Sequence, residues 1–224
     1  MRLLAAVLML ALSACTAGPN GRDRYARLLT PTANPSEVVA TELAFARAAQ
    51  EDGQWTAFRE YATEDAVMFV PQPVNAHDWL KQQSNPPEAV RWQPHELWSS
   101  CDGSLAVTKG AWQRPDGTTG YFTTIWQRQR SGKYEWVLDQ GDVLTQPLVE
   151  PDFIRTQIAD CAGERPAGQP QAGPQGSGNG ASVDRTLDYS WTVNADGSRS
   201  LSVRLLKGGA MSKVLLSRVS APTS

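Results

Sequence analysis

Acidic residues that alternate with tryptophans could place a carboxyl group inside an apolar pocket. In the stretch RWQPHELWSS, strict alternation puts Glu96 on one face with Trp92 and Trp98, and puts His95 on the opposite, exposed face. Burial beside indole rings raises the pKa of a carboxyl, because desolvation disfavours its charged form. Glu96 is therefore the first candidate for a general base.

A second candidate acid lies near the end of the stretch KYEWVLDQGD. Alternation places Asp142 on the face that carries Trp136, Leu138 and Gln140, and places Asp139 on the opposite face. Either Asp142 or Asp139 could act as a pocket carboxylate. The alternative, which we favour, is a charged group at a solvated strand end.

Tryptophan is concentrated in the same part of the chain. Seven of the eight tryptophans fall between Trp55 and Trp136. Their rings could line a pocket for a flat apolar ligand, because large rings supply contact area at low rotamer cost. The alternative is that they form the core and cover the outer face of a sheet. The candidates for ligand contact are Trp92, Trp98, Trp112 and Trp136.

Other kinds of site have little support in the composition. The chain has 21 basic and 23 acidic residues and no basic stripe, which argues against a nucleic-acid partner. The two histidines, His77 and His95, are not spaced with cysteines or carboxylates in a metal-binding pattern. No phosphate-binding glycine loop is present, so we expect neither a metal nor a cofactor.

Turn and cap residues predict the helices that hold these side chains. A helix begins at Asn34 and Pro35 and ends at Gly53, and a short second helix covers residues 55–61. The predicted inward stripe of the first helix is Val39, Leu43, Ala46 and Gln50, with Val38, Phe45 and Ala49 beside it.

The rest of this region reads mainly as strands. A strand is expected at AVMFVP, a short helix at HDWLKQQ, and then strands over residues 91–100, 104–113, 119–129 and 133–142. The tight turns Asp116-Gly117 and Ser131-Gly132 join the last three strands, which predicts an antiparallel meander.

The first 35 residues read as an export signal and a tether. An apolar stretch from Leu3 to Leu12 is too short to span a bilayer, which needs roughly 20 residues. The sequence Leu12-Ser13-Ala14-Cys15 that follows resembles the bacterial lipobox. The resemblance implies a signal peptide over 1–14 and lipidation of Cys15 at the start of a tether over 15–35. Thr16, in place of an aspartate, implies the periplasmic side of the outer membrane; inner-membrane anchoring is the alternative.

With Cys15 lipidated, Cys101 and Cys161 remain as a pair in an oxidising compartment. A disulfide between them is the simplest interpretation. A catalytic thiol at either position is the alternative, although neither has a histidine beside it in the sequence.

The C-terminal part predicts a small second sheet. Residues 163–182 are largely Gly, Pro, Gln and Ala and are expected to form a linker. Residues 183–220 then read as a three-stranded β-meander with one apolar face, formed in its first strand by Leu187, Tyr189 and Trp191. So small a sheet cannot enclose a core. We expect it to dock on the preceding domain; the alternatives are a weakly ordered tail and a strand-donating arm for a partner.

The order of elements in residues 36–162 resembles that of the nuclear-transport-factor-2-like, or SnoaL-like, domains. The stretches ELAFARAAQEDGQWTAFREYATEDAVMFVP and SGKYEWVLDQGD carry the likeness. The resemblance implies an α+β fold, a cone in which helices pack on a curved antiparallel sheet. Members often carry a histidine where this chain has Leu138 or Gln140, and its absence counts against catalysis.

Taken together, these features predict a periplasm-facing lipoprotein that acts as a non-catalytic ligand-binding or protein-interaction module. It would be held to the membrane through Cys15 and would bind a small apolar ligand or an envelope protein. The first alternative is a small isomerase, dehydratase or hydrolase that uses Glu96 or Asp142 as its base. The second is an envelope assembly factor that acts through the C-terminal meander.

Overall fold

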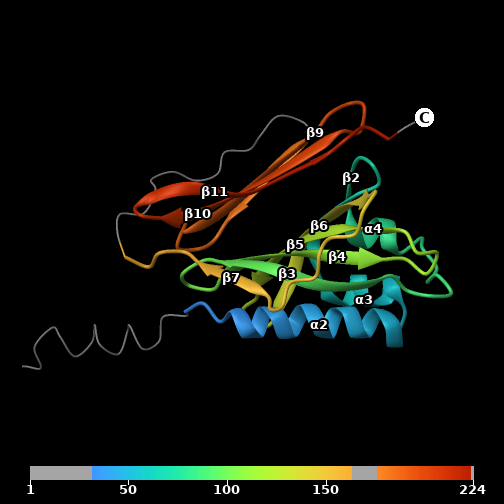
Figure 1. Ribbon diagram of the computed structural model, residues 1–224, viewed down its shortest axis with the longest axis horizontal. Coiled ribbons are helices and arrows are strands. Elements are labelled where there is room, and N and C mark those ends of the chain that lie inside the picture. The colour runs from blue at the N-terminus through green and yellow to red at the C-terminus, as the bar shows by residue number, and fades with distance from the viewer. Residues whose placement is uncertain (1–31, 163–175, 223–224) are drawn as a thin grey trace, which may run out of the picture. The chain divides into compact units, whose positions relative to one another are not determined.

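The computed structural model describes residues 32–162 and 176–222 (Figure 1). Cys15 and the rest of the predicted signal and tether up to residue 31 lie outside the described residues, as do residues 163–175 of the predicted linker. Within the described ranges, no helix is long and apolar enough to cross a membrane.

The first part of the chain is an α+β domain, as predicted. Its sheet has seven strands in the order β2-β1-β6-β5-β4-β3-β7. The helices are α2 (Pro35–Glu51), α3 (Gln54–Tyr61) and α4 (Ala76–Leu80). The strands are β1 (Ala62–Phe69), β2 (Pro73–Asn75), β3 (Arg91–Ser99), β4 (Leu105–Gln113), β5 (Thr119–Arg128), β6 (Tyr134–Leu144) and β7 (Arg155–Ile158). This order of elements is the one that the nuclear-transport-factor-2-like resemblance implied.

Strands β4, β5 and β6 form the predicted antiparallel meander. Gly117 and Gly132 occupy the two turns with φ of +87°, a conformation that glycine adopts without strain. One strand is added in parallel on each side of the antiparallel strands β3 to β6. Strand β1 pairs with β6, and β7 pairs with β3. The sheet is therefore completed by strands that lie far apart in the sequence.

Helix α2 packs on the sheet through a different stripe from the one predicted. Its buried residues are Val38, Glu42, Phe45 and Ala49, whereas Leu43 is 46% exposed. The prediction was wrong because it excluded the carboxylate of Glu42 from the interior. Phe45 contacts Phe58, Trp92 and Trp126, and these rings form the centre of the core beneath the helices.

The C-terminal residues form a second sheet with the strand order β11-β10-β9-β8. Its strands are β8 (Ser177–Ala181), β9 (Leu187–Val193), β10 (Arg199–Lys207) and β11 (Ala210–Val219). The three predicted strands are present, but β8 lies inside the range expected to be linker. Its glycines suit the place, because a Cβ added to Gly178 would lie 2.5 Å from the Trp191 ring and one added to Gly180 would lie 2.6 Å from the Tyr189 ring. Composition alone could not show that the aromatic rings on β9 require glycine at these positions of β8.

The second sheet covers the outer face of the seven-stranded sheet, the face opposite α2 and α3 (Figure 1). The predicted apolar face of the C-terminal strands is the one that packs inward. The buried side chains from the two sheets include Val107, Ile125 and Leu138 on one side and Leu201, Val203 and Leu205 on the other. Apolar burial is thus the main stabilising contribution to this contact.

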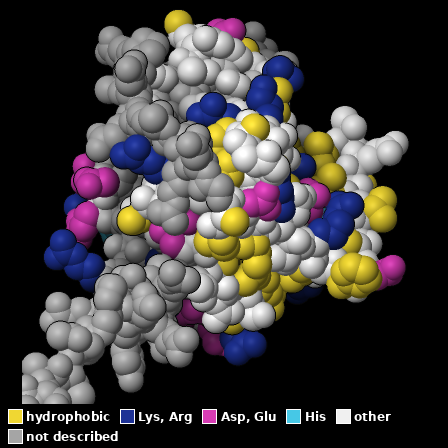
Figure 2. Space-filling view, turned by 90° about the vertical axis from the view of Figure 1, so that its left-hand side faces the viewer, with side chains coloured by type: hydrophobic (Ala, Val, Ile, Leu, Met, Phe, Trp, Pro, Cys, Tyr) yellow, Lys and Arg dark blue, Asp and Glu magenta, His cyan; other side chains and the backbone are white. Residues whose placement is uncertain are grey.

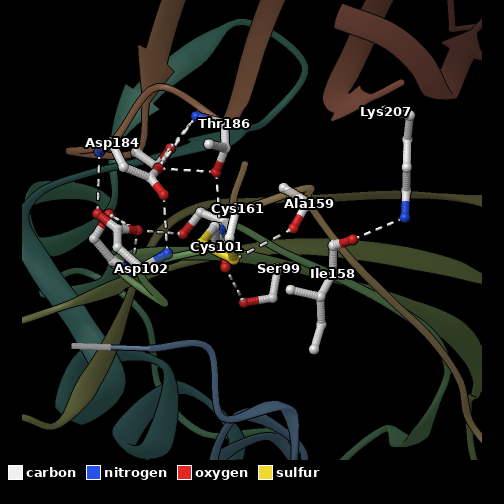
Figure 3. Close-up of a disulfide and its surroundings, with 12 residues drawn as sticks. Ser99, Cys101, Asp102, Ile158, Ala159, Cys161, Asp184, Thr186 and Lys207 are labelled. Atoms are coloured by element: carbon white, nitrogen blue, oxygen red, sulfur yellow. Dashed lines mark hydrogen bonds between the residues drawn. A yellow bond between two sulfur atoms is a disulfide. The ribbon is translucent and has the colours of Figure 1, made fainter. Parts of the chain in front are cut away.

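A disulfide joins Cys101 to Cys161, as predicted, with a Cα–Cα distance of 5.2 Å (Figure 3). It links the ends of the parallel strands β3 and β7. Beside it, two loops of the different sheets bind each other: the backbone N–H of Asp102 donates to Asp184 Oδ2 at 2.9 Å, and that of Asp184 donates to Asp102 Oδ2 at 3.0 Å. The N–H of Cys101 donates to Thr186 Oγ1 at 2.8 Å. The disulfide therefore lies where the two sheets are joined by polar contacts.

The surface carries apolar side chains among charged ones. Figure 2 shows one side of the molecule, where hydrophobic side chains gather in an area bordered by basic and acidic groups. Among the described residues, the most exposed large apolar side chains are Val149, Val183 and Phe153. The mixed charges along this side agree with the nearly balanced composition.

Candidate functional site

A cavity of about 300 Å³ lies between the helices and the inner face of the seven-stranded sheet. Most of its wall is aromatic or aliphatic, and a few polar groups reach it. The lining residues that matter below are Phe45, Trp55, Phe58, Trp92, Trp112 and Phe122 among the rings, and Gln54, Arg114, Thr124, Asp139 and Asp142 among the polar side chains. Pockets for small ligands typically have this composition, an apolar wall with a few placed polar groups.

Asp139 is the acidic group that this wall surrounds most closely. It lies on β6, and its Oδ2 accepts a hydrogen bond of 2.6 Å from Thr124 Oγ1 on the neighbouring strand β5. Burial raises the pKa of Asp139 to about 7; the hydrogen bond from Thr124 opposes the rise and the charge of Glu42 adds to it. Near neutral pH this carboxyl can therefore both accept and donate a proton.

Glu42 on α2 is fully buried on the same inner face. Its Oε1 accepts from Trp92 Nε1 at 2.8 Å, and its Oε2 accepts from Thr108 Oγ1 at 2.6 Å and from Trp126 Nε1 at 3.0 Å. Burial raises the pKa of Glu42, and the three hydrogen bonds partly oppose this rise. Because Trp92 lines the cavity, Glu42 fixes one part of the cavity wall without reaching the cavity itself.

Replacing Asp139 with asparagine should change how stability depends on pH. A carboxyl whose pKa is higher in the folded state favours folding at low pH, and this contribution is lost as pH rises from about 4 to about 7. The free energy of unfolding of the Asp139→Asn variant, relative to the unaltered protein, should therefore increase by several kcal/mol over this interval, at about 1.36 kcal/mol per pKa unit. Urea unfolding at several pH values measures it.

The matched variant Thr124→Val should act in the opposite sense on the same group. It removes the hydrogen bond that favours the charged carboxylate, so the pKa of Asp139 should rise further. A stability difference between Asp139→Asn and the unaltered protein that stays constant from pH 4 to pH 8 would show that the raised pKa is wrong.

The structure places Glu96 outside the cavity. The register of β3 against β4 shifts between Pro94 and Glu96, so this β-bulge moves every later residue to the other face. Glu96 lies on the outer face and pairs with Arg155 at 3.1 Å and Lys109 at 4.0 Å. The expectation that it shares a face with Trp92 is wrong, and nothing in this position suits a pocket base.

The same bulge explains two other placements on β3. Trp98 packs between the two sheets, away from the cavity, whereas Trp92 lines it. His95, predicted to be exposed, is 6% exposed, and its Nε2 has no hydrogen-bond partner among the described residues. Burial lowers the pKa of His95, because desolvation disfavours the charged imidazolium.

Strand β6 has a second register shift, at Val137. Trp126 pairs with Trp136 and Ile125 pairs with Leu138, so the face changes between these two residues of β6. Asp139 consequently shares the inner face with Trp136, contrary to the simple alternation. Trp136 is fully buried in the core and does not line the cavity.

Asp142 and Trp112 are the other predicted site residues that line the cavity. Asp142 Oδ1 accepts a hydrogen bond from the N–H of Val143 at 2.8 Å. Trp112 donates its Nε1–H to the carbonyl of Tyr121 at 2.9 Å, and the guanidinium of Arg114 lies 5.1 Å from its ring centre. The structure thus brings Asp142, Trp92 and Trp112 to one cavity and excludes Glu96, Trp98 and Trp136.

Glu42 was not predicted as a site residue, and Asp139 was considered as a pocket carboxylate only as the less favoured alternative. Glu42 has a usable signal, because it falls between Val38, Phe45 and Ala49 at helical spacing. Asp139 has none in the sequence alone, since its face depends on the bulge at Val137. In the described ranges, 32–162 and 176–222, no three His, Cys, Asp or Glu side chains are arranged to hold a metal ion.

No family model and no curated protein matches the sequence. Among solved structures, a provisionally assigned ketosteroid isomerase from Parabacteroides distasonis is similar over 52% of this chain and 97% of its own, with 11% identity and a TM-score of 0.41. A provisionally assigned aromatic ring hydroxylase from Novosphingobium aromaticivorans is similar over 50% of this chain and 90% of its own, with 15% identity and a TM-score of 0.36. Scores this low say nothing about activity.

The order of helices and strands and the cavity beneath the helices together define a protein with the nuclear-transport-factor-2-like fold. In this chain the fold carries a second, C-terminal sheet on its outer face.

Proposed function

We propose that the protein binds a small, flat, mainly apolar molecule that carries one hydrogen-bonding group. The observation that carries the proposal is the carboxyl of Asp139 in the wall of an aromatic cavity, with Thr124 as its one hydrogen-bond partner among the described residues. The rings supply apolar contact, and the carboxyl supplies orientation. A cavity of about 300 Å³ suits a molecule of one or two rings.

Binding is favoured over catalysis by what surrounds Asp139. An enzyme that removes a proton beside a carbonyl also needs donors that stabilise the oxyanion. The described lining residues include no tyrosine and no histidine, and the indole N–H groups of Trp92 and Trp112 are already donated to Glu42 and Tyr121. The other side-chain donors of the wall belong to Gln54, Trp55, Arg114 and Gln140, and none of them is hydrogen-bonded to Asp139 in the structure.

The test is fluorescence titration of the folded protein with 2-naphthol, a flat molecule with one hydroxyl group. The tryptophans of the wall should report saturable binding, and Asp139→Leu should weaken it about tenfold or more, because a ligand hydroxyl then loses its partner. The control is Asp78→Leu, whose side chain is 77% exposed. Equal affinity of the two variants, or no saturation with the unaltered protein, would contradict the proposal. Native mass spectrometry of the purified protein can reveal a natural ligand that remains bound.

A second candidate is proton transfer by Asp139, favoured by its pKa of about 7. The carboxylate would take a proton from a carbon next to a carbonyl group and return it to another position of the substrate. Deuterium exchange into 2-tetralone, followed by NMR, tests this activity. Exchange that Asp139→Asn abolishes would establish catalysis, and exchange at the solvent rate would restrict the protein to binding.

We also propose that the protein works at the periplasmic side of the outer membrane, anchored through Cys15. The supporting feature is the sequence Leu12-Ser13-Ala14-Cys15 after an apolar stretch of about ten residues. Metabolic labelling with a tagged fatty acid should mark the unaltered protein and not Cys15→Ser. A serine variant that is still labelled would exclude the lipid anchor at this position.

A further inference from the structure

One segment of β6 belongs both to the cavity and to the contact with the C-terminal sheet. Asp139, Gln140, Gly141 and Asp142 are consecutive residues, and all four line the cavity. The middle two are also held by side chains of the second sheet. A change in the contact between the second sheet and this segment therefore changes the cavity wall directly.

Arg199, at the start of β10, makes the first of these contacts. Its Nη2 donates to the carbonyl of Gly141 at 2.6 Å, and its Nε donates to Gln140 Oε1 at 3.4 Å. The guanidinium also lies 5.4 Å from the ring centre of Phe69. Burial lowers the pKa of Arg199 and the charge of Asp142 opposes this, so the two charged groups interact across the segment. The planar guanidinium holds the backbone and a side chain of β6 at once.

Ser217, on β11, makes the second contact. Its hydroxyl lies 2.7 Å from the hydroxyl of Tyr121 and accepts from Gln140 Nε2 at 3.0 Å. Tyr121 is the partner of Asp142 in the register of β5 and β6. The second sheet thus fixes both strands at the same end of the cavity, and Ser217 is 6% exposed there.

We propose that Arg199 and Ser217 are positioning residues, through which the C-terminal sheet holds residues 139–142 in the conformation that shapes the cavity. This inference extends the proposed function, and its expected effect on ligand binding rests on that function. Because the same segment contacts a bound molecule on one face and the second sheet on the other, cavity occupancy and docking of the sheet stabilise each other. Such coupling is reciprocal, and typical values change an affinity 5- to 150-fold.

The sheet itself offers a matched control for each positioning residue. Arg204, on the same strand as Arg199, is exposed and pairs with Asp188 at 2.7 Å within the second sheet. Ser200 is hydrogen-bonded to Thr192 at 2.9 Å, also within that sheet and away from β6. Each control removes a contact of the same chemical kind from the same sheet without touching the cavity wall.

The experiment compares Arg199→Gln with Arg204→Gln in the full chain, using two readouts. The first is affinity for 2-naphthol, which should fall at least fivefold in Arg199→Gln and stay unchanged in Arg204→Gln. The second, measured without ligand, is amide hydrogen exchange of residues 139–143 together with the chemical shift of the Asp139 carboxyl carbon. Exchange should quicken about tenfold and the signal should move in Arg199→Gln alone.

The second readout separates the inference from the proposed function. If the unaltered protein does not bind 2-naphthol, the proposed function fails, while exchange and chemical shift still decide whether the second sheet positions β6. Ser217→Ala against Ser200→Ala repeats the comparison with a smaller change, should Arg199→Gln fail to fold. Equal exchange at residues 139–143 and an unmoved Asp139 signal in both variant pairs would overturn the inference.

Discussion

A chain that ends after residue 162 is expected to form dimers or aggregates at concentrations where the full chain stays monomeric. The truncation uncovers Trp98, Val107, Ile125 and Leu138, which are buried against the C-terminal sheet in the structure. Contiguous apolar surface of this kind drives association in water. Light scattering of the purified variant measures the size, and urea unfolding should show a clear loss of stability.

Point variants of the full chain give the control for this truncation. Val203→Asp places a charge in the contact between the sheets, where Val203 is fully buried, and should cost several kcal/mol. Ser202→Asp adds the same charge on the other face of β10, where Ser202 is only half-buried, and should cost little. A truncated protein that remains monomeric and as stable as the full chain would contradict the role of the second sheet as a cover.

Replacing Glu42 with alanine is expected to destabilise the protein by about 3–5 kcal/mol. The variant removes three buried hydrogen bonds, from Trp92 Nε1, Thr108 Oγ1 and Trp126 Nε1, and the loss of each costs about 1–3 kcal/mol. Trp92 Nε1 is left unpaired, whereas Trp126 Nε1 still donates to Thr108 Oγ1 at 3.0 Å. Relaxation and the removal of a buried carboxyl offset part of the sum. Urea unfolding at pH 7 measures the change.

Two variants of the same helix bracket this effect. Glu42→Gln keeps an acceptor oxygen and should lose less stability than Glu42→Ala. Glu37→Ala removes a partly exposed carboxylate 3.9 Å from Arg128 and should change stability by under about 1 kcal/mol. If Glu42→Ala were no more harmful than Glu37→Ala, the buried network would have no role in stability.

The sequence predicted those parts of the fold that depend on local signals. The turns at Gly117 and Gly132 and the strands that they join were correct, because glycine at positive φ marks them. The prediction of the apolar face of β9 was also correct, because the pairing of β9 with β10 has no register shift. The disulfide followed from having two cysteines left for an oxidising compartment, once Cys15 was set aside.

Errors arose where one extra residue changed the face of a strand. The bulges after Pro94 and at Val137 exchange the inner and outer sides, which removed Glu96 from the cavity and brought Asp139 into it. Pro94 hinted at the first bulge, because proline disrupts a strand's ladder. Nothing nearby in the sequence indicates the second, which lies between Trp136 and Leu138. Of the predicted site residues, Trp92, Trp112 and Asp142 therefore line the cavity, and Glu96, Trp98 and Trp136 do not.

The parallel pairs at the two sides of the main sheet set the order in which the chain can fold. Ala62 of β1 pairs with Trp136 of β6, and Glu96 of β3 pairs with Arg155 of β7. Contacts between residues so distant in sequence require large loops to close and slow folding. During synthesis, β1 cannot pair with β6 until β6 has been made, whereas the meander of β4, β5 and β6 can form from neighbouring strands. We therefore expect the meander to form before β1 joins the sheet.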